Sequence, residues 1–260
     1  MMSEDQSRIN QMWHDWFVTD AFKMEKQMMH ILRLLPHEPR CKFCRSPFEG
    51  VGGVIVRALF GKKRSTLNPH FCNICEDFAN KNPGGHEVEM SMLFADVRGS
   101  TALSERMSPT EFSGLINRFY IESTNAIIEE DGLVEKLAGD AVAAFWGAGI
   151  AGPAYVSRTI VAAQKIMKLM ELQKIPVGVG VHAGVAYFGA MGLANGLVNI
   201  SAIGDEVNLA ARLASKAAAG EIVVSEKALE QANVDGNNLE SRSLELKGIS
   251  EPVTVRVMRT

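Results

Sequence analysis

Apolar residues recur at intervals of three, four or seven near the start of the chain, at Trp13, Phe17, Met24, Met28, Ile31 and Leu35. This spacing places them on one face of an α-helix. Pro36 ends the pattern, because proline cannot extend a helix. We expect residues 1–36 to form an amphipathic helix that packs on the next domain or on a second copy of the chain. A helix lying on a membrane surface is the less favoured alternative, since Trp, Phe and Met also suit that interface.

From residue 88 onward, short apolar segments alternate with longer segments of helical periodicity. The pattern predicts helices at 109–130, 154–172, 205–218 and 226–231, and strands at 88–97, 132–147 (a hairpin turning near Gly139), 177–184, 186–191, 222–224, 244–246 and 253–258. Strands joined by hairpins, with helices between pairs, favour an α+β fold with an antiparallel or mixed sheet. Asn82-Pro83-Gly84-Gly85 is the expected linker before this domain.

The four cysteines form two Cys-x-x-Cys pairs, Cys41 with Cys44 and Cys72 with Cys75. Two such pairs can supply four thiolates to one tetrahedral zinc ion. We therefore expect residues 37–82 to form a small treble-clef-like unit in which the second pair opens a helix, and which orients a dimer or receives a signal. An iron–sulfur cluster or thiol redox sensor, and cysteines that bind no metal, are the alternatives. His70 is a possible substitute ligand.

Composition narrows the class of protein. The chain has 260 residues, a hydrophobic content of 47% and a net charge of −3, which suits one large globular domain with a small one. Charged residues or glycine interrupt every apolar stretch before the roughly eighteen residues of a membrane span, and the first residues are polar, so a cytoplasmic protein is expected. The acidic balance and the missing basic stripe disfavour nucleic-acid binding, including a zinc-ribbon binder.

Two aspartates, Asp96 and Asp140, each follow an apolar run. Divalent cations prefer such oxygen ligands, and a pair of ions can activate an attacking hydroxyl while neutralising a polyphosphate. The turn Gly99-Ser100-Thr101 follows Asp96, and its backbone N–H groups can approach a phosphate closely. The pattern therefore indicates phosphoryl chemistry.

Five segments occur in the order found in one family: 92–104, 136–147, 177–184, 203–213 and 246–253. Together they resemble the catalytic domain of the class III nucleotide cyclases, over roughly 87–258. The resemblance implies a ferredoxin-like core, extended at its C-terminal end, for residues 86–260. It also implies a homodimer in which the metal aspartates of one subunit meet the base-reading and transition-state residues of the other. This chain carries both sets, so a homodimer could hold two complete sites.

The resemblance also implies roles for individual residues. Asp96 and Asp140, with the backbone carbonyl of Val97, would hold two Mg²⁺ or Mn²⁺ ions in each site. Arg212 would neutralise charge on the α-phosphate in the transition state, and Asn208 would position the ribose. These two residues are four apart on the expected helix and so project from one face. Lys247 corresponds to a lysine that contacts the β- and γ-phosphates.

Lys136 and Ser201 correspond to the residues that select the base. Family members that use ATP carry Lys at the position of Lys136 and Asp, Thr or Ser at that of Ser201. Those that use GTP carry Glu at the first position and Cys at the second. Adenine N1 is an acceptor to which a lysine can donate. One departure precedes Ser201, because residues 196–201 read Gly-Leu-Val-Asn-Ile-Ser where many bacterial members read basic-x-x-Tyr-Thr.

The resulting hypothesis is an adenylate cyclase that converts ATP to 3′,5′-cyclic AMP and pyrophosphate by in-line attack and is regulated through its N-terminal unit. The alternative is a catalytically silent cyclase-fold module that binds nucleotide or a partner. The intact set of expected metal, base and transition-state residues disfavours the silent module.

Overall fold

The structure, a computed structural model, describes residues 4–36, 39–192, 197–249 and 251–259. Gly196 and Ser250, which belong to two of the segments singled out above, lie outside the described residues. The chain folds as two compact units, Met1–Val88 with Tyr187–Ala202, and Glu89–Ala186 with Ile203–Thr260. We call them the cysteine unit and the catalytic unit. Residues 187–202, expected within the cyclase domain, thus belong to the cysteine unit.

The elements up to the first long sheet strands are α1 (Glu4–Val18), α2 (Lys23–Leu34), α3 (Gly50–Phe60), α4 (Asn73–Lys81), β1 (Gly84–Val97), α5 (Ser100–Arg106), α6 (Pro109–Glu129), β2 (Leu133–Ala138) and β3 (Ala141–Trp146). The remaining ones are α7 (Ala148–Ala151), α8 (Tyr155–Leu172), β4 (Val177–Gly192), β5 (Val198–Ile203), α9 (Asp205–Lys216), β6 (Glu221–Ser225), α10 (Glu226–Ala232), β7 (Glu240–Leu244) and β8 (Val253–Arg259). Among the described residues, no helix is both long and apolar enough to cross a bilayer.

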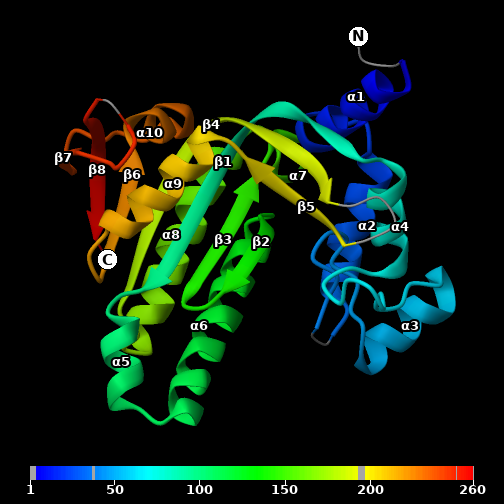
Figure 1. Cartoon of the computed structure of the whole chain (residues 1–260), viewed down its shortest axis with the longest axis horizontal. Helices are drawn as coiled ribbons and strands as arrows, with labels where there is room; N and C mark the ends of the chain where they lie inside the picture. The colour runs from blue at the N-terminus through cyan, green and yellow to red at the C-terminus, as the bar shows by residue number, and fades with distance from the viewer. Residues whose placement is uncertain (1–3, 37–38, 193–196, 250, 260) are drawn as a thin grey trace. The chain divides into compact units, whose positions relative to one another are not determined.

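The catalytic unit is built on a ferredoxin-like sheet. Its elements follow the order β1-α6-β2-β3-α8-β4, and the strands lie side by side in the order β2-β3-β1-β4. Beyond β4 the sheet continues with β6, β8 and β7, where β6 is parallel to β4 and the other two are antiparallel to their neighbours. The predicted α+β, ferredoxin-like class with a C-terminal extension is therefore confirmed (Figure 1).

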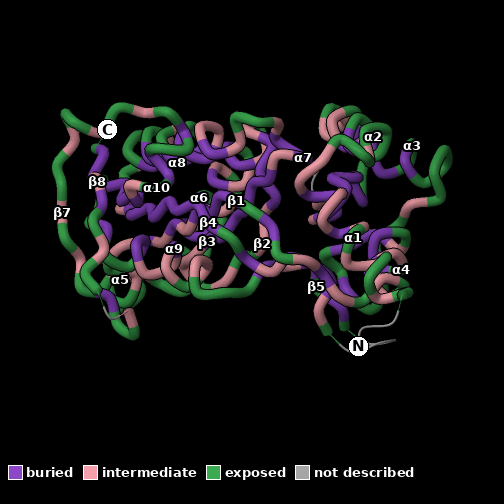
Figure 2. The backbone as a smooth tube through the Cα atoms, turned by 90° about the horizontal axis from the view of Figure 1, so that it is seen from above, coloured by how far each residue is buried: buried purple, intermediate pink, exposed green. Residues whose placement is uncertain are grey.

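Helices cover both faces of this sheet. Apolar side chains of α6, α8 and α10, among them Phe119, Ile166 and Leu229, pack with the strands in the larger hydrophobic core. Helix α9 covers the opposite face, where Leu213 packs with Val223 and Val257. Figure 1 shows α9 in front of the strands and α8 behind them, and Figure 2 shows buried central strands beside an exposed β7. The sheet thus holds the end of β1 and the β2–β3 turn at fixed positions.

Several local signals were sufficient to predict elements of the catalytic unit. Ser108 caps α6 through a reciprocal capping box with Glu111, as expected for the helix predicted at 109–130. The hairpin predicted at 132–147 is β2–β3, with Gly139 in the left-handed region at its turn. The two strands predicted at 177–184 and 186–191 are one strand, β4, because the backbone stays extended through Gly184. Helices α5 and α7 were not predicted, nor was strand β5, most of which belongs to the cysteine unit.

The N-terminal amphipathic helix is two helices rather than one. Helix α1 ends at Val18, where the Thr19 hydroxyl bonds back to the carbonyl of Asp15, and α2 begins at Lys23. Trp13 and Phe17 of the predicted stripe are buried, and Trp13 meets Phe43, Phe78 and Phe188 edge to face. Because the helix breaks here, α2 buries a different face from the predicted one, and its buried residues are Lys26, Met29 and Leu32. The predicted stripe is therefore wrong in its second half, and Met24 and Ile31 are exposed.

The predicted linker at 82–85 is ordered structure. The indole N–H of Trp13 donates to the carbonyl of Asn82 (3.0 Å), and β1 begins at Gly84. A Cβ atom on Gly85 would lie 2.2 Å from the carbonyl oxygen of Phe188 in β4. The glycines that resembled a flexible linker therefore allow two strand backbones to approach closely within the cysteine unit.

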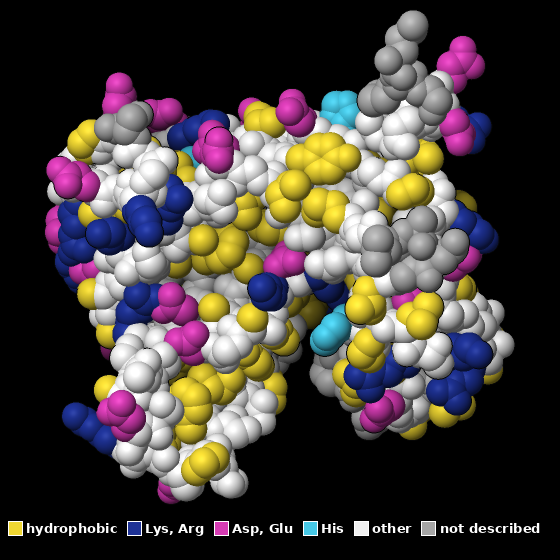
Figure 3. All heavy atoms as spheres, viewed as in Figure 1, with side chains coloured by type: hydrophobic (Ala, Val, Ile, Leu, Met, Phe, Trp, Pro, Cys, Tyr) yellow, Lys and Arg dark blue, Asp and Glu magenta, His cyan; other side chains and the backbone are white. Residues whose placement is uncertain are grey.

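The C-terminal end of the sheet carries a buried carboxylate, Glu221 on β6. It accepts two hydrogen bonds from Arg242 (2.6 and 2.8 Å) and one from Arg259 (2.7 Å). The Arg242 guanidinium lowers the pKa of Glu221 to about 2. Figure 3 shows basic side chains gathered beside acidic ones over β7 and β8. This network joins β6, β7 and β8, at the end of β8 away from the turn that carries Lys247.

The depressed pKa of Glu221 predicts a pH dependence of stability. The ionised form is favoured in the folded state, so its contribution is present above the ordinary pKa of 4.5 and is lost as the pH falls towards 2. Glu221→Gln should lower the free energy of unfolding at pH 7 by on the order of 2 kcal/mol and flatten its decline between pH 4.5 and 2. Urea titrations across that range measure both effects. Glu230→Gln, which changes an exposed carboxylate on α10, is the control and should behave as wild type.

Candidate functional site

The two predicted metal aspartates lie next to each other in the catalytic unit. Antiparallel pairing of β1 with β3 places Asp96 opposite Ala141, the residue after Asp140. The N–H of Val97 donates to the carbonyl of Asp140 (2.9 Å), which fixes the β1 end against the hairpin turn. Both carboxylates are partly exposed. Two partly exposed carboxylates at adjacent backbone positions are hard oxygen donors of the kind that Mg²⁺ and Mn²⁺ prefer.

The predicted phosphate turn follows these aspartates directly. Gly99 adopts φ +65° and precedes helix α5, and a Cβ atom there would have open space around it. The Ser100 hydroxyl donates to the Asp140 carboxylate, so the turn is attached to the second aspartate. Thr101 is exposed on the first turn of α5. The predicted turn is therefore attached to the aspartate pair through Ser100.

Arg98 is a site residue that the sequence reasoning missed. Its guanidinium forms an ion pair with the Asp96 carboxylate and donates to the carbonyl of Ser215 in α9 (3.2 Å). Burial lowers the pKa of Arg98, and the charge of Asp140 opposes that shift. A divalent cation at the aspartate pair would compete with this guanidinium for Asp96. The sequence could have indicated this residue, because an arginine two positions after the first predicted metal aspartate lies close to it along the chain.

Helix α9 carries the predicted transition-state residues. Asn208 is exposed and Arg212 is half-buried. A Cβ atom on Gly248 would lie 3.4 Å from a guanidinium nitrogen of Arg212, so the arginine lies directly over the turn after Lys247. The structure thus places the arginine and the predicted phosphate-binding lysine at one turn. Lys136, the predicted base reader on β2, is exposed.

Ser201, the other predicted base reader, lies on β5 within the cysteine unit. That strand is bonded to the loops around the cysteines. The Asn68 side chain donates to the carbonyl of Val198 (3.0 Å), and Lys42 donates to the Asn199 side chain (3.1 Å). Asn68 is itself buried. The cysteine loops therefore fix the backbone just before Ser201, a connection that sequence reasoning did not predict.

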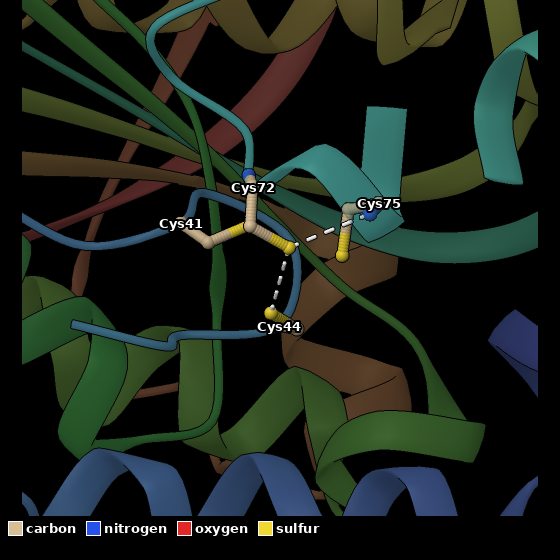
Figure 4. Close-up of side chains that lie close together, drawn as sticks. All are labelled: Cys41, Cys44, Cys72 and Cys75. Atoms are coloured by element: carbon tan, nitrogen blue, oxygen red, sulfur yellow. Dashed lines mark hydrogen bonds between the residues drawn. The ribbon is translucent and has the colours of Figure 1, made fainter. Parts of the chain in front are cut away.

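The four cysteines converge as predicted. All four are buried, and their sulfur atoms lie within 4.8 Å of one another. Figure 4 shows the four side chains drawn together, and the Sγ atoms of Cys44 and Cys72 are 3.7 Å apart. The Cys72 N–H donates to the Cys41 sulfur (3.2 Å). Cys72 also caps α4, which confirms that the second pair opens a helix. The four sulfurs are close enough to bind one metal ion.

The thiols differ in acidity and in exposure. Hydrogen bonds from the other three cysteines lower the pKa of Cys44, with that from Cys41 the largest, and a lowered pKa favours the thiolate that binds metal. Cys44 and Cys75 line a cavity of about 400 Å³, whose other walls are mainly apolar side chains of α1, α2 and α4. Their exposed fractions of 7% and 6% exceed the 1% and 0% of Cys41 and Cys72. His70 is exposed and is not one of the clustered ligands.

Comparison with known proteins identifies the family of the region that carries the aspartate pair. The sequence matches the family described as "Adenylate and Guanylate cyclase catalytic domain" over residues 85–258. The chain belongs to this cyclase family. The match includes every predicted catalytic and nucleotide-binding residue and begins after the four cysteines.

Individual cyclases are similar over the same region. The adenylate cyclase of Anabaena cylindrica is 28% identical over 181 residues, which are 64% of this chain and 36% of that protein. An uncharacterized protein of Mycobacterium tuberculosis is 31% identical over 65% of this chain and 32% of its own length. The chain therefore spans about a third of the length of these curated relatives.

Solved cyclase structures share the fold. The adenylyl cyclase CyaB from P. aeruginosa superposes with a TM-score of 0.60 at 25% identity, covering 67% of this chain and 95% of the other. The guanylyl cyclase Cya2 gives a TM-score of 0.59 at 24% identity, covering 67% and 93%. The second similarity concerns the fold alone, and cyclases named for either base share it.

Proposed function

We propose that this cyclase is an adenylate cyclase that forms 3′,5′-cyclic AMP and pyrophosphate from ATP. The observation that carries the proposal is the adjacency of Asp96 and Asp140 at the ends of β1 and β3. The adenylate cyclases among the similar proteins support the choice of product. Lys136 supports ATP because its ammonium can donate to adenine N1 but cannot accept from guanine N1–H.

In the proposed reaction, the ribose 3′ oxygen attacks the α-phosphorus and loses its proton, while the bond from that phosphorus to the bridging oxygen breaks and pyrophosphate leaves. Asp96, Asp140 and the Val97 carbonyl would hold two Mg²⁺ or Mn²⁺ ions, which supply charge neutralisation and activation of the 3′ hydroxyl. Arg212 donates to the α-phosphate oxygens as charge develops there, and Asn208 orients the ribose. Lys247 binds the terminal phosphates beside Arg212.

We further propose that the active form is a homodimer with sites shared between subunits. In each site, one chain supplies Asp96 and Asp140 and its partner supplies the residues of α9 and the base readers. Two observations support this proposal. The sequence resembles the class III cyclases, and this one chain carries both the metal aspartates and the base-reading and transition-state residues. Two complete sites per dimer follow.

Base selection is tested by assaying the purified protein with ATP and GTP in the presence of Mn²⁺. The wild type should prefer ATP. The double variant Lys136→Glu, Ser201→Cys should shift the ratio of kcat/KM values towards GTP, because a carboxylate accepts from guanine N1–H. Lys168→Glu, an equal charge change at an exposed position of α8, should leave the ratio unchanged. An unchanged ratio in the double variant would show that these residues do not read the base.

We also propose that the four cysteines bind one structural zinc ion and that this unit regulates the cyclase. Four clustered sulfurs, two of them in a pair that opens a helix, suit zinc. A regulatory route is available because Asn68 and Lys42 bond to the strand that carries Ser201. A change at the metal would then reach the base-reading strand through two hydrogen bonds.

Metal analysis tests the zinc proposal. Aerobically purified protein should contain about one zinc per chain and show no iron–sulfur absorbance. Cys44→Ser should release the zinc and destabilise the cysteine unit, because a unit of this size owes much of its folding free energy to the metal. The control His70→Ala should retain zinc, since His70 lies outside the cluster. Brown protein that loses its colour in air would instead identify a redox cluster.

A further inference from the structure

One face of β4 consists mainly of glycines where α9 packs on it. Gly178, Gly180, His182 and Gly184 alternate along the strand and therefore point to the same face. A Cβ atom on Gly180 would lie 2.2 Å from the backbone nitrogen of Ala214 in α9, and one on Gly184 would lie 2.7 Å from the Glu206 carboxyl carbon. The helix thus rests on strand backbone, and His182 is the one side chain among these four residues.

His182 connects the first turn of α9 to the start of α10. The ring is 3% exposed, and its Nε2 atom contacts the carboxylate of Glu206. Its Nδ1 atom lies 2.8 Å from the hydroxyl of Ser225, the residue that caps α10. The other oxygen of Glu206 lies 4.0 Å from the ammonium of Lys227. The imidazole therefore holds one partner at each nitrogen.

The hydrogen bonds from Ser225 to His182 and from His182 to Glu206 have defined donors and acceptors. The Ser225 oxygen already accepts the N–H of Ala228 (3.2 Å), so its own hydrogen can be donated to Nδ1 of His182. A ring that accepts at Nδ1 carries its proton on Nε2 and donates it to Glu206. Burial lowers the pKa of His182, which agrees with a neutral ring. The bond to Glu206 then has a defined donor and acceptor.

We propose that His182 is a positioning residue of the cyclase reaction, which sets the placement of Asn208 and Arg212 by holding Glu206 at the first turn of α9. The inference rests on the proposed role of Arg212. Glu206 precedes Asn208 by two residues and Arg212 by six on the same helix. The glycine face permits α9 to slide along β4, and the bond from His182 to Glu206 opposes that movement. Small misplacements of an oriented group cost large factors in rate.

Two conservative substitutions separate the two bonds of the ring. His182→Gln places an amide N–H near the position of Nε2 and keeps the donor to Glu206, whereas His182→Asn reproduces only the reach of Nδ1 towards Ser225. We expect His182→Asn and His182→Ala to lower kcat about tenfold with little change in the KM for ATP, and His182→Gln to retain most of the activity. Adding Glu206→Ala to His182→Ala should cause little further loss, because both changes remove one interaction.

Hydrogen exchange provides a readout that does not need catalysis. Amides of residues 205–212 should exchange faster in His182→Asn and His182→Ala than in wild type, and at the wild-type rate in His182→Gln. An inactive wild type would overturn the proposed function, yet these exchange rates would still test the placement of α9. Activity and protection retained in His182→Asn but lost in His182→Gln would overturn the inference, because the bond to Ser225 would then be the one that matters. If the His182 variants fail to fold, two changes at Glu206 test the same bond. Glu206→Gln keeps an acceptor oxygen and should behave as wild type, whereas Glu206→Ala should show the loss of activity and protection expected for His182→Asn. Equal behaviour of the two Glu206 variants would overturn the inference.

Discussion

Asp96→Asn should abolish cyclic AMP formation while the protein remains folded. Asparagine keeps the shape of the side chain but removes the negative charge that a divalent cation requires. Asp96 is partly exposed, and its ion-pair partner Arg98, whose side chain is 21% exposed, keeps its hydrogen bond to the Ser215 carbonyl. Asp140→Asn should have the same effect. Cyclic AMP formed from ATP with Mn²⁺, together with a thermal melt of each variant, measures both parts of this prediction.

The matched control is Asp235→Asn, which removes an exposed carboxylate before β7. It should keep wild-type activity. If Asp96→Asn or Asp140→Asn retained activity within a few-fold of wild type, the two-metal assignment would be wrong. An unfolded variant would be recognised by its melt, and Asp96→Glu, which keeps the charge, would then test the ligand geometry instead.

Arg212→Ala should lower kcat by on the order of a hundredfold with little change in KM, the pattern of an interaction made mainly in the transition state. The side chain lies over Gly248 and is half-buried, so its removal leaves the helix core intact. Steady-state kinetics with ATP measures both constants. An effect on KM alone would assign Arg212 to ground-state binding.

The same variant tests whether sites are shared between subunits. Inactive Asp96→Asn protein mixed with the weakly active Arg212→Ala protein should give more activity than either variant alone, because one site of each heterodimer then has every residue. No recovery, with subunit exchange verified by two distinguishable tags, would show that each chain builds its own site.

Local signals predicted the catalytic unit well because its elements carry their own boundaries. Ser108 and Glu111 mark the start of α6 in the sequence, and Gly139 marks the β2–β3 turn. Glycine positions were less informative elsewhere. The strand predicted to end at Gly184 continues through it, and Gly85 was assigned to a linker, yet both glycines permit close approach to another element. A one-dimensional pattern does not distinguish a glycine that turns the chain from one that accepts a neighbour.

The candidate site was predictable where residues belong to motifs and unpredictable where they meet only in space. Asp96 lies at the end of β1 and Asp140 in the turn before β3, so their adjacency follows from the pairing of β1 with β3. Arg98 bonds to a carbonyl 117 residues away, and Asn68 to one 130 residues away. The break between α1 and α2 likewise contains no proline or glycine to mark it. Its position depends on packing rather than on backbone preference.

The hydrogen bond from Asn68 to Val198 has a consequence for how such proteins are recombined. Residues 187–202 are sequence of the cyclase family, but they fold with the cysteines. Exchanging residues 1–82 alone for the N-terminal unit of another cyclase would leave Phe188 without Trp13 and Val198 without Asn68. The transferable module is therefore discontinuous, since a working chimera would have to carry residues 187–202 along with the cysteines.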